Sequence, residues 1–259
     1  LDFANQTARA LLFLFHVVRF FSVIKYHKSH ITFTLCFVQL ALTIYTAYYK
    51  FELFSAKETK EIQKPADEWA KSKKLTAVIN AGMYQADGYT NTGYMKNYDF
   101  INNPALNSKY NAVVAFNRKN DSVPEFQIID LKCQNWDELK AQYHTLIQGI
   151  RMIDCNQKNV WSYQEQRWSI AAIGTDKSGN VLFLHASYPY RVHDFINMLL
   201  KSSLDIKNAM YLEGGPEASF YLNHLIKIEQ VGSYETGFRE DDDNYHFWAI
   251  PNVIGITKK

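Results

Sequence analysis

The residues best suited to chemistry are Glu213 and the two glycines that follow it, Gly214 and Gly215. They come directly after the apolar residues 209–212, which we expect to form a buried strand. A carboxylate held at the end of a strand is well positioned to act as a general acid or base. The glycines let the backbone approach a ligand closely, and their N–H groups can bind a phosphate or another oxyanion. A tight turn with an exposed glutamate is the plainer interpretation. Ser219 lies four residues further on.

A second polar group follows another apolar segment, residues 75–79, which is also a predicted strand. Asn80 can both donate and accept hydrogen bonds, as a residue that orients a sugar hydroxyl or a phosphate must. Gly82, two residues later, permits a close approach of the backbone. The alternative is an asparagine that caps its own turn.

A third group runs from Ser187 to the start of a helix predicted over residues 192–200. It contains a base, His193, and an acid, Asp194, at a helix N-terminus, where anions bind readily. An ordinary surface helix with an aspartate in its first turn would look the same.

Three further polar residues, Gln148, Arg151 and Arg167, lie around predicted strands. Arginine suits bidentate recognition of phosphate. Ion pairing at the surface is the alternative for both arginines.

These residues need a scaffold, and the apolar patterns predict an α+β fold with a mixed β-sheet core and flanking helices in a single main domain. Residues 84–110 form a long loop rich in Gly, Asn and Tyr, and a loop of that length in a compact domain is usually functional. Residues 170–174 and 181–185 flank a turn and predict a β-hairpin. The remaining predicted strands are 112–116, 126–130, 145–153 and 249–256, and the remaining predicted helices are 66–72 and 136–144. Strands are also favoured from about residue 43 onward, where residues 50–55 alternate polar and apolar side chains.

The composition excludes some partners. The net charge is +2 with no basic run, which argues against a nucleic-acid surface. Aromatic residues make up 15% of the chain, enough to build a core or line a carbohydrate cleft. The eight histidines contain no HxH or HxxxH pair, and we expect no metal site and no cofactor. The acidic residues 240–243 predict a solvated loop, with a calcium site as the alternative.

The three cysteines are Cys36, Cys133 and Cys155. An odd count without a CxxC pair allows at most one disulfide, of which Cys133–Cys155 is the alternative considered. Buried free thiols are the favoured interpretation.

The first part of the chain is apolar. Residues 31–49 carry no charge over 19 positions, enough to span a membrane, but they are rich in strand-forming residues. We divide the chain into an N-terminal segment, 1–42, and a main domain, 43–259. The segment is a signal or anchor, or extra strands. Basic residues before position 31 would put the main domain outside the cytoplasm, so we expect an exported, periplasmic or cell-surface protein that touches a membrane only through this segment.

Four motifs in order resemble the phosphodiester glycosidase family, a domain of bacterial exopolysaccharide-related envelope proteins and of the mannose-6-phosphate uncovering enzyme. The resemblance covers roughly residues 48–257, and its most specific element is Leu-Glu-Gly-Gly-Pro-Glu-Ala-Ser at 212–219. The other motifs are Ala-Val-Ile-Asn-Ala-Gly-Met-Tyr at 77–84, Asn-Ala-Val-Val-Ala-Phe-Asn at 111–117, and Ala-Ala-Ile-Gly-Thr-Asp at 171–176 with Gly-Asn-Val-Leu-Phe at 179–183.

The resemblance implies hydrolysis of a sugar-1-phosphodiester between the anomeric carbon and the phosphate, on a sugar-phosphate or glycan substrate. Glu213 would be the principal carboxylate, with Asp194 as its pair, His193 as proton shuttle and Asn80 as orienting residue. The expected substrate-binding residues are Gly82, Gln148, Arg151, Arg167, Ser187, Gly214, Gly215 and Ser219. Two departures stand out: the acid before the glycines is Asp in the animal enzyme of the family, and Ile170 stands where members often carry Arg.

Two rival functions fit the same residues. A non-catalytic carbohydrate-binding or envelope-assembly module on this fold is the first, because a fold does not dictate a function. A metal-dependent phosphodiesterase that cleaves the P–O bond is the second, and the scattered histidines disfavour it.

Overall fold

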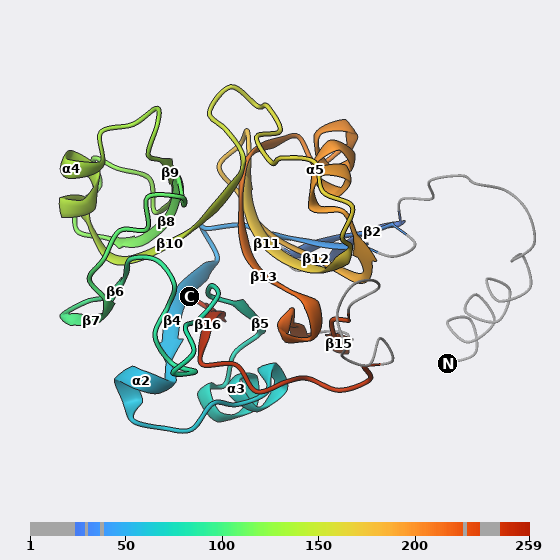
Figure 1. The fold of residues 1–259 in the computed structure, drawn as a ribbon, viewed down its shortest axis with the longest axis horizontal. Coiled ribbons are helices and arrows are strands. Elements are labelled where there is room, and N and C mark those ends of the chain that lie inside the picture. Colours follow the sequence, from blue (N-terminus) through green and yellow to red (C-terminus); the bar gives the residue numbers. More distant parts are fainter. Residues whose placement is uncertain (1–23, 29–30, 37–38, 225–226, 234–243) are drawn as a thin grey trace, which may run out of the picture.

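The computed structural model of the 259-residue chain describes residues 24–28, 31–36, 39–224, 227–233 and 244–259. Their backbone forms two β-sheets, and all of the strand pairings described in them are antiparallel (Figure 1).

The larger sheet runs in the order β1-β2-β3-β12-β11-β13-β10-β6-β7, while β8 also pairs with β10 and β9 pairs with β8. Its strands are β1 (Ile24–Lys28), β2 (Ile31–Cys36), β3 (Gln39–Ile44), β6 (Met95–Asn97), β7 (Phe100–Asn103), β8 (Ala112–Arg118), β9 (Phe126–Asp130), β10 (Tyr143–Ile153), β11 (Trp168–Asp176), β12 (Val181–Tyr190) and β13 (Ile206–Gly214).

The smaller sheet runs in the order β15-β14-β5-β16-β4. Its strands are β4 (Tyr49–Ser55), β5 (Ala77–Asn80), β14 (Phe220–Asn223), β15 (Lys227–Gln230) and β16 (Asn252–Lys258). The helices are short: α2 (Ala56–Thr59), α3 (Ala66–Lys73), α4 (Trp136–Leu139) and α5 (Val192–Lys201), with the 3₁₀ turns η1 (Lys140–Gln142) and η2 (Gly215–Glu217).

The two sheets face each other across an inter-sheet core, which includes Leu42, Ile79, Ala171, Leu212 and Phe220. The opposite face of β11, β12 and β13 carries a second core under α5, here called the α5 core, with Ile170, Ala172, Tyr211, Phe195 and Leu199 among its members. In Figure 1, α5 lies beyond the larger sheet and α3 beyond the smaller one, so helices flank the sheets on two sides.

This layering explains why β11 and β12 are almost continuously apolar. A strand covered on one face alternates apolar and polar residues, whereas a strand covered on both faces has apolar residues on both. Along β11, Ala171 and Ile173 belong to the inter-sheet core, and Ile170 and Ala172 belong to the α5 core.

Most predicted elements are confirmed to within a few residues. The predicted strand over 126–130 coincides with β9, and the predicted helix over 192–200 is α5. The hairpin turn between β11 and β12 is fixed by Asp176, which accepts hydrogen bonds from the Asn180 backbone N–H at 2.8 Å and from its side-chain amide at 2.7 Å.

Some predictions need correction. The α+β class holds in a coarse form, because strands predominate and helices are few, and the expectation of a mixed sheet is wrong because the described pairings are antiparallel. Residues 136–144 form only the short α4 and η1 before β10 begins at Tyr143. The long loop at 84–110 contains the small hairpin of β6 and β7. β14 and β15 were not predicted from the sequence.

In its described part, the uncharged stretch 31–49 forms β2, β3 and the first residue of β4. Of the two alternatives for this stretch, a membrane span and strands, the structure shows strands. β3 pairs with β12 from Ile44↔Val181 to Gln39↔Ala186, so this stretch extends the larger sheet. Within the described part of the chain, no helix has both the length and the apolar character needed to cross a membrane.

Candidate active site

A β-bulge near the end of β13 directs Glu213 into the molecule. Ala172 pairs with Tyr211 and Ala171 pairs with Glu213, so Leu212 is an extra residue in the strand. Directly paired residues share a face of the sheet, and Ala171 belongs to the inter-sheet core. Strict alternation from Tyr211 would have put Glu213 on the face of the α5 core instead. The bulge therefore turns the carboxyl towards the interior between the sheets, a use of bulges that is common beside active sites.

Glu213 is buried there, with 9% of its surface exposed. Burial, together with the smaller effect of the nearby Glu217 charge, raises the pKa of Glu213 to about 8, while the Gly214 N–H opposes the shift. That N–H donates to Glu213 Oε1 at 3.1 Å. The carboxyl therefore keeps its proton at neutral pH and can act as an acid.

Glu217 lies on η2, and Asn80 holds this turn from the smaller sheet. The fully buried Asn80 amide donates through Nδ2 to the Glu217 carbonyl at 2.9 Å. Its Oδ1 accepts from the Ser219 N–H at 2.8 Å, and the Ser219 hydroxyl donates to the same Glu217 carbonyl at 2.9 Å. Two predicted site residues, Asn80 and Ser219, are thus brought to the Glu213 turn, where they position its backbone.

The glycines of this turn are required by their surroundings. A Cβ at Gly214 would lie 1.9 Å from the hydroxyl of Tyr211 and 2.5 Å from Cδ1 of Trp168. Trp168 Nε1 donates to that same hydroxyl at 2.9 Å. Gly215 has φ of 67°, a conformation that favours glycine.

Gly82 follows β5 with φ of 136°, and a Cβ there would lie 2.6 Å from Oδ1 of the fully buried Asn91. A side chain at position 82 would therefore collide with the loop that joins β5 to β6. This explains the glycine through backbone conformation and packing, independently of any ligand.

Gln148 uses its whole amide to fasten that loop and its continuation to β10. Its Oε1 accepts from the backbone N–H groups of Tyr94 and Asn107, both at 2.9 Å. Its Nε2 donates to the carbonyls of Asn107 at 2.9 Å and Tyr110 at 2.7 Å. All four of these hydrogen bonds of the Gln148 amide are thus made to backbone groups of the protein.

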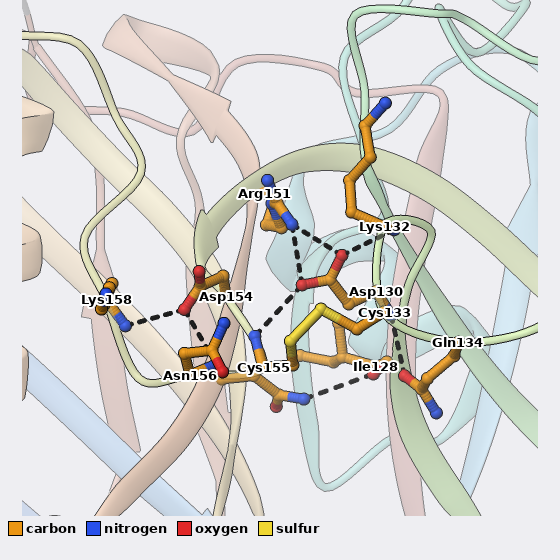
Figure 2. The surroundings of a disulfide bond; sticks show 11 residues. Ile128, Asp130, Lys132, Cys133, Gln134, Arg151, Asp154, Cys155, Asn156 and Lys158 are labelled. Atoms are coloured by element: carbon orange, nitrogen blue, oxygen red, sulfur yellow. Dashed lines mark hydrogen bonds and ion pairs between the residues drawn. A yellow bond between two sulfur atoms is a disulfide. The ribbon is translucent and has the colours of Figure 1, made fainter.

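Arg151 on β10 is held by Asp130, as Figure 2 shows. Its guanidinium donates to both carboxylate oxygens, at 2.7 and 2.9 Å. Cys133 and Cys155 form a disulfide beside this pair, and the Cys155 N–H donates to Asp130 at 3.1 Å. The favoured prediction of buried free thiols is wrong for these two cysteines, which are exposed and bonded to each other.

His193 and Asp194 lie in the first turn of α5, on the other face of the larger sheet from Glu213. Asp194 contacts His193 Nδ1 at 3.4 Å and Arg191 at 3.5 Å. Arg191 also binds Glu165 at 2.9 Å.

Arg167 belongs to this group on the far face. It favours the charged form of Glu165, whose pKa lies below its usual range mainly because Arg191 donates a hydrogen bond to it. The charge that acts on Glu213 comes from Glu217, four residues away on the same turn, and Asp194 contributes nothing to that shift.

Two features of the site escaped the sequence analysis. Glu217 stands within the motif at 212–219, yet nothing in the sequence told whether its side chain would approach Glu213. His185 is fully buried on β12 in register with Ala171. The apolar sequence around it predicts a core strand and does not mark His185 as a functional residue. Ser187, predicted to bind substrate, contacts His185 Nδ1 at 3.4 Å.

Among the described residues, one group of three potential metal ligands comes together: Asp130, Cys133 and Cys155. The two sulfur atoms are joined in the disulfide, and Asp130 binds Arg151. The acidic run at 240–243, the predicted alternative for calcium, lies outside the described residues.

A sequence profile of the Phosphodiester glycosidase family matches residues 73–257, well over half of the chain. The chain belongs to the phosphodiester glycosidase family. The resemblance found in the motifs is thereby confirmed. No curated protein sequence matches the chain.

Three solved structures share the fold at low sequence identity. The catalytic domain of zebrafish N-acetylglucosamine-1-phosphodiester alpha-N-acetylglucosaminidase, auto-inhibited by its pro-peptide, matches with a TM-score of 0.57 and 15% identity, over 93% of this chain and 82% of that one. A hypothetical protein from Synechocystis matches with a TM-score of 0.59 and 13% identity, over 92% of this chain and 62% of that one. A protein from Burkholderia pseudomallei named as exported matches with a TM-score of 0.53 and 8% identity, over 87% and 74%.

The family position where Arg is often found is occupied here by Ile170, which is fully buried in the α5 core. This member therefore has a packed aliphatic side chain at that position.

Proposed function

We propose that this phosphodiester glycosidase hydrolyses a sugar-1-phosphodiester between the anomeric carbon and the phosphate oxygen. The observation that carries the proposal is the buried Glu213 carboxyl, held at the bulged end of β13 with its pKa raised to about 8. Family membership supports this reaction class, and the buried acid is a group suited to it.

An uncharged carboxyl fits an anionic substrate for an electrostatic reason. An ionised Glu213 would repel the phosphodiester, whereas the protonated form can donate a hydrogen bond to a phosphate oxygen. When the bond between the anomeric carbon and oxygen breaks, Glu213 gives its proton to the leaving phosphate monoester.

The second carboxylate of the proposed reaction is Glu217. Glycoside hydrolysis commonly uses two carboxyl groups, one protonated and one ionised. The influence of Glu217 on the pKa of Glu213 requires the two to be close. Glu217 accepts a proton from the water that attacks the anomeric carbon, and a proton passed between the carboxyls afterwards restores the starting state.

Each arginine also has a role in the proposed reaction, as do His193 and Asp194, which lie on the face of the larger sheet opposite Glu213. Arg151 supplies positive potential for the phosphate, Arg167 adds to that potential at longer range from the far face, and the amides of Gly214 and Gly215 supply N–H donors. Arg151 does so as one half of its pair with Asp130. His193 and Asp194 would have to act on a part of the substrate that reaches around the edge of the sheet.

We also propose that the protein works in an exported, oxidising environment such as the periplasm or cell surface, on glycan or exopolysaccharide material. The Cys133–Cys155 disulfide supports this, because exposed disulfides persist mainly outside the reducing cytosol. One protein of the same fold is named as exported.

A non-catalytic carbohydrate-binding module is the second candidate, and the buried Ile170 favours it because a frequent family cation is missing there. The two candidates separate in one assay. The chain is incubated with N-acetylglucosamine-1-phosphodiesters and UDP-N-acetylglucosamine in ¹⁸O-labelled water. Release of a phosphate monoester with the label on the sugar supports the proposal. Label on the phosphate would point to P–O cleavage, and glycan binding without any release would support the module.

A further inference from the structure

His185 occupies a row of three residues that crosses the larger sheet. It pairs with Ala171 on β11, and Ala171 pairs with Glu213 on β13. Directly paired residues project from the same face, so His185 and Glu213 both point into the interior between the sheets, with only the Ala171 methyl group between them. Adjacent strands are about 4.8 Å apart, so these two side chains start roughly 10 Å apart and can both reach the space above Ala171.

The hydrogen bonds around His185 determine which of its nitrogens carries the proton. The Ser187 hydroxyl donates its one hydrogen to Oε1 of Gln230. It therefore contacts His185 Nδ1, at 3.4 Å, as an acceptor, and this arrangement favours the proton on Nδ1. Nε2 then carries a lone pair, is fully buried and has no hydrogen-bond partner of normal geometry.

A buried polar atom without a partner is costly, so its position in a native fold calls for an explanation. We infer that His185 is a positioning residue for Glu213: its Nε2 accepts a hydrogen bond from a bound water above Ala171, and this water accepts the hydrogen bond that the Glu213 carboxyl donates. A buried water commonly makes about three hydrogen bonds, and the Ala218 backbone, which also interacts with the ring, offers a third partner.

The charge states of the two groups agree with this chain of hydrogen bonds. Burial lowers the pKa of His185 to about 4, with the Ala218 backbone opposing the shift, so the ring is neutral and remains an acceptor. Among the described elements packed around the pair, η2 contributes Glu217 and β15 contributes the exposed Lys227–Glu229 ion pair. The facing residues of β3 and β11 are Leu40 and Ala171, which carry no charge.

The inference rests on the proposed function only for its catalytic consequence, so its test does not need a substrate. The chain is labelled with ¹⁵N-histidine, and the ring nitrogens of His185 are assigned by their loss in His185→Gln. We expect a protonated Nδ1 and an unprotonated Nε2 whose resonance moves as the pH passes through about 8, the pKa of Glu213. In Glu213→Gln that response disappears, because the amide does not titrate. In Glu217→Gln it persists.

His144 on β10, which stacks on the Tyr98 ring at 4.8 Å, is the matched control and should show no change that depends on Glu213. A protonated Nε2 in His185, a resonance that stays flat through this range, or an unchanged response in Glu213→Gln would each overturn the inference.

Ala171→Val and Ala171→Thr provide a second arm, since valine and threonine have the same shape and differ in one hydroxyl group. Valine fills the space above position 171 with methyl groups and should abolish the coupling, that is, the response of the His185 Nε2 resonance to the titration of Glu213. The threonine hydroxyl can take the place of the water and should retain this coupling. Equal behaviour of the two variants contradicts the inference. If either fails to fold, the wild-type and Glu213→Gln spectra still decide.

Measuring sugar-phosphodiester hydrolysis on the same samples separates the two proposals. Coupling between His185 and Glu213 without hydrolysis would leave this inference standing and remove the proposed function. Hydrolysis without coupling would do the reverse. Where both hold, we expect His185→Phe to lower kcat about tenfold or more with little change in KM, and His185→Gln to recover most of the loss, because glutamine restores a polar partner.

Discussion

The Ser219 N–H donates a 2.8 Å hydrogen bond to Asn80 Oδ1, joining residues 139 positions apart in the sequence. The same amide donates to the Glu217 carbonyl, so one buried asparagine fixes both ends of the segment that carries the second carboxylate. The order of this turn therefore depends on the strand that precedes Gly82, which links two sequence motifs into one site.

Replacing Asn80 with alanine should lower the free energy of unfolding by about 1–3 kcal/mol, because it leaves the Ser219 N–H without a partner and weakens the turn. Urea denaturation measures this directly. Asn156→Ala, at an exposed position, is the matched control and should change little. Equal stabilities of the two variants would show that the turn does not depend on Asn80.

Glu213 should make the stability of the protein fall as the pH rises. Its pKa is about 8 in the folded state against an ordinary value of 4.5, so between these values the folded state holds a proton that the unfolded state lacks. The stabilisation is complete below the ordinary pKa and is lost as the pH rises through about 8, at up to ~1.4 kcal/mol per pH unit.

The measurement is the free energy of unfolding from pH 5 to pH 9 for the wild type and for Glu213→Gln. The variant should lack this part of the pH dependence, and Glu138→Gln, at an exposed position, should retain it. Parallel curves for the wild type and Glu213→Gln would mean that the carboxyl is ionised in the folded protein.

Gly214 should tolerate no side chain while Tyr211 keeps its hydroxyl, because a Cβ there would lie 1.9 Å from that oxygen. We expect Gly214→Ala to cost roughly 1–3 kcal/mol through overpacking. Tyr211→Phe removes the oxygen, so the double variant should lose less than the sum of the two single losses. Additive losses in this double-mutant cycle would rule out the collision with the Tyr211 hydroxyl as the cause.

The Cys133–Cys155 disulfide should stabilise the fold by about 3 kcal/mol, as expected for a crosslink between residues 22 positions apart. The double variant Cys133→Ala/Cys155→Ala, compared with the wild type by urea denaturation without reductant, tests this. Adding a reductant should bring the wild type to the stability of the variant. If the reductant leaves wild-type stability unchanged while the variant is weaker, the loss would come from packing instead of the crosslink.

How far the sequence predicts this structure depends on the kind of signal. Strands such as β9 and helix α5 have strong apolar patterns, and both are found where those patterns predict them. The short α4 and η1 differ from the predicted longer helix because the residues from Tyr143 onward pair with β8, and that pairing depends on distant residues. β14 was missed because its four residues directly follow the motif at 212–219 and are too few to show a clear alternation of apolar and polar residues.

The motifs of the site could be predicted from the sequence, whereas the face of the sheet on which each side chain lies could not. Glu213 and Asn80 were identified from the glycine-containing turns that follow apolar strands, and both lie at the same end of the inter-sheet core. The bulge at Leu212 is invisible in the sequence, yet it decides that Glu213 meets Glu217 instead of the Asp194 face. Side-chain direction at a strand end depends on register, which local patterns do not specify.

The most direct test of the central claim is the turnover of Glu213→Gln on a substrate that the wild type hydrolyses, measured near neutral pH with folding checked by thermal unfolding. Glutamine keeps the size of the side chain and removes the proton that Glu213 is proposed to donate to the leaving phosphate monoester. If Glu213 is the acid, kcat should fall by about 10²–10⁴-fold, and wild-type activity should decline as the pH rises through about 8. A folded Glu213→Gln that retains kcat within a few-fold of the wild type would contradict the account.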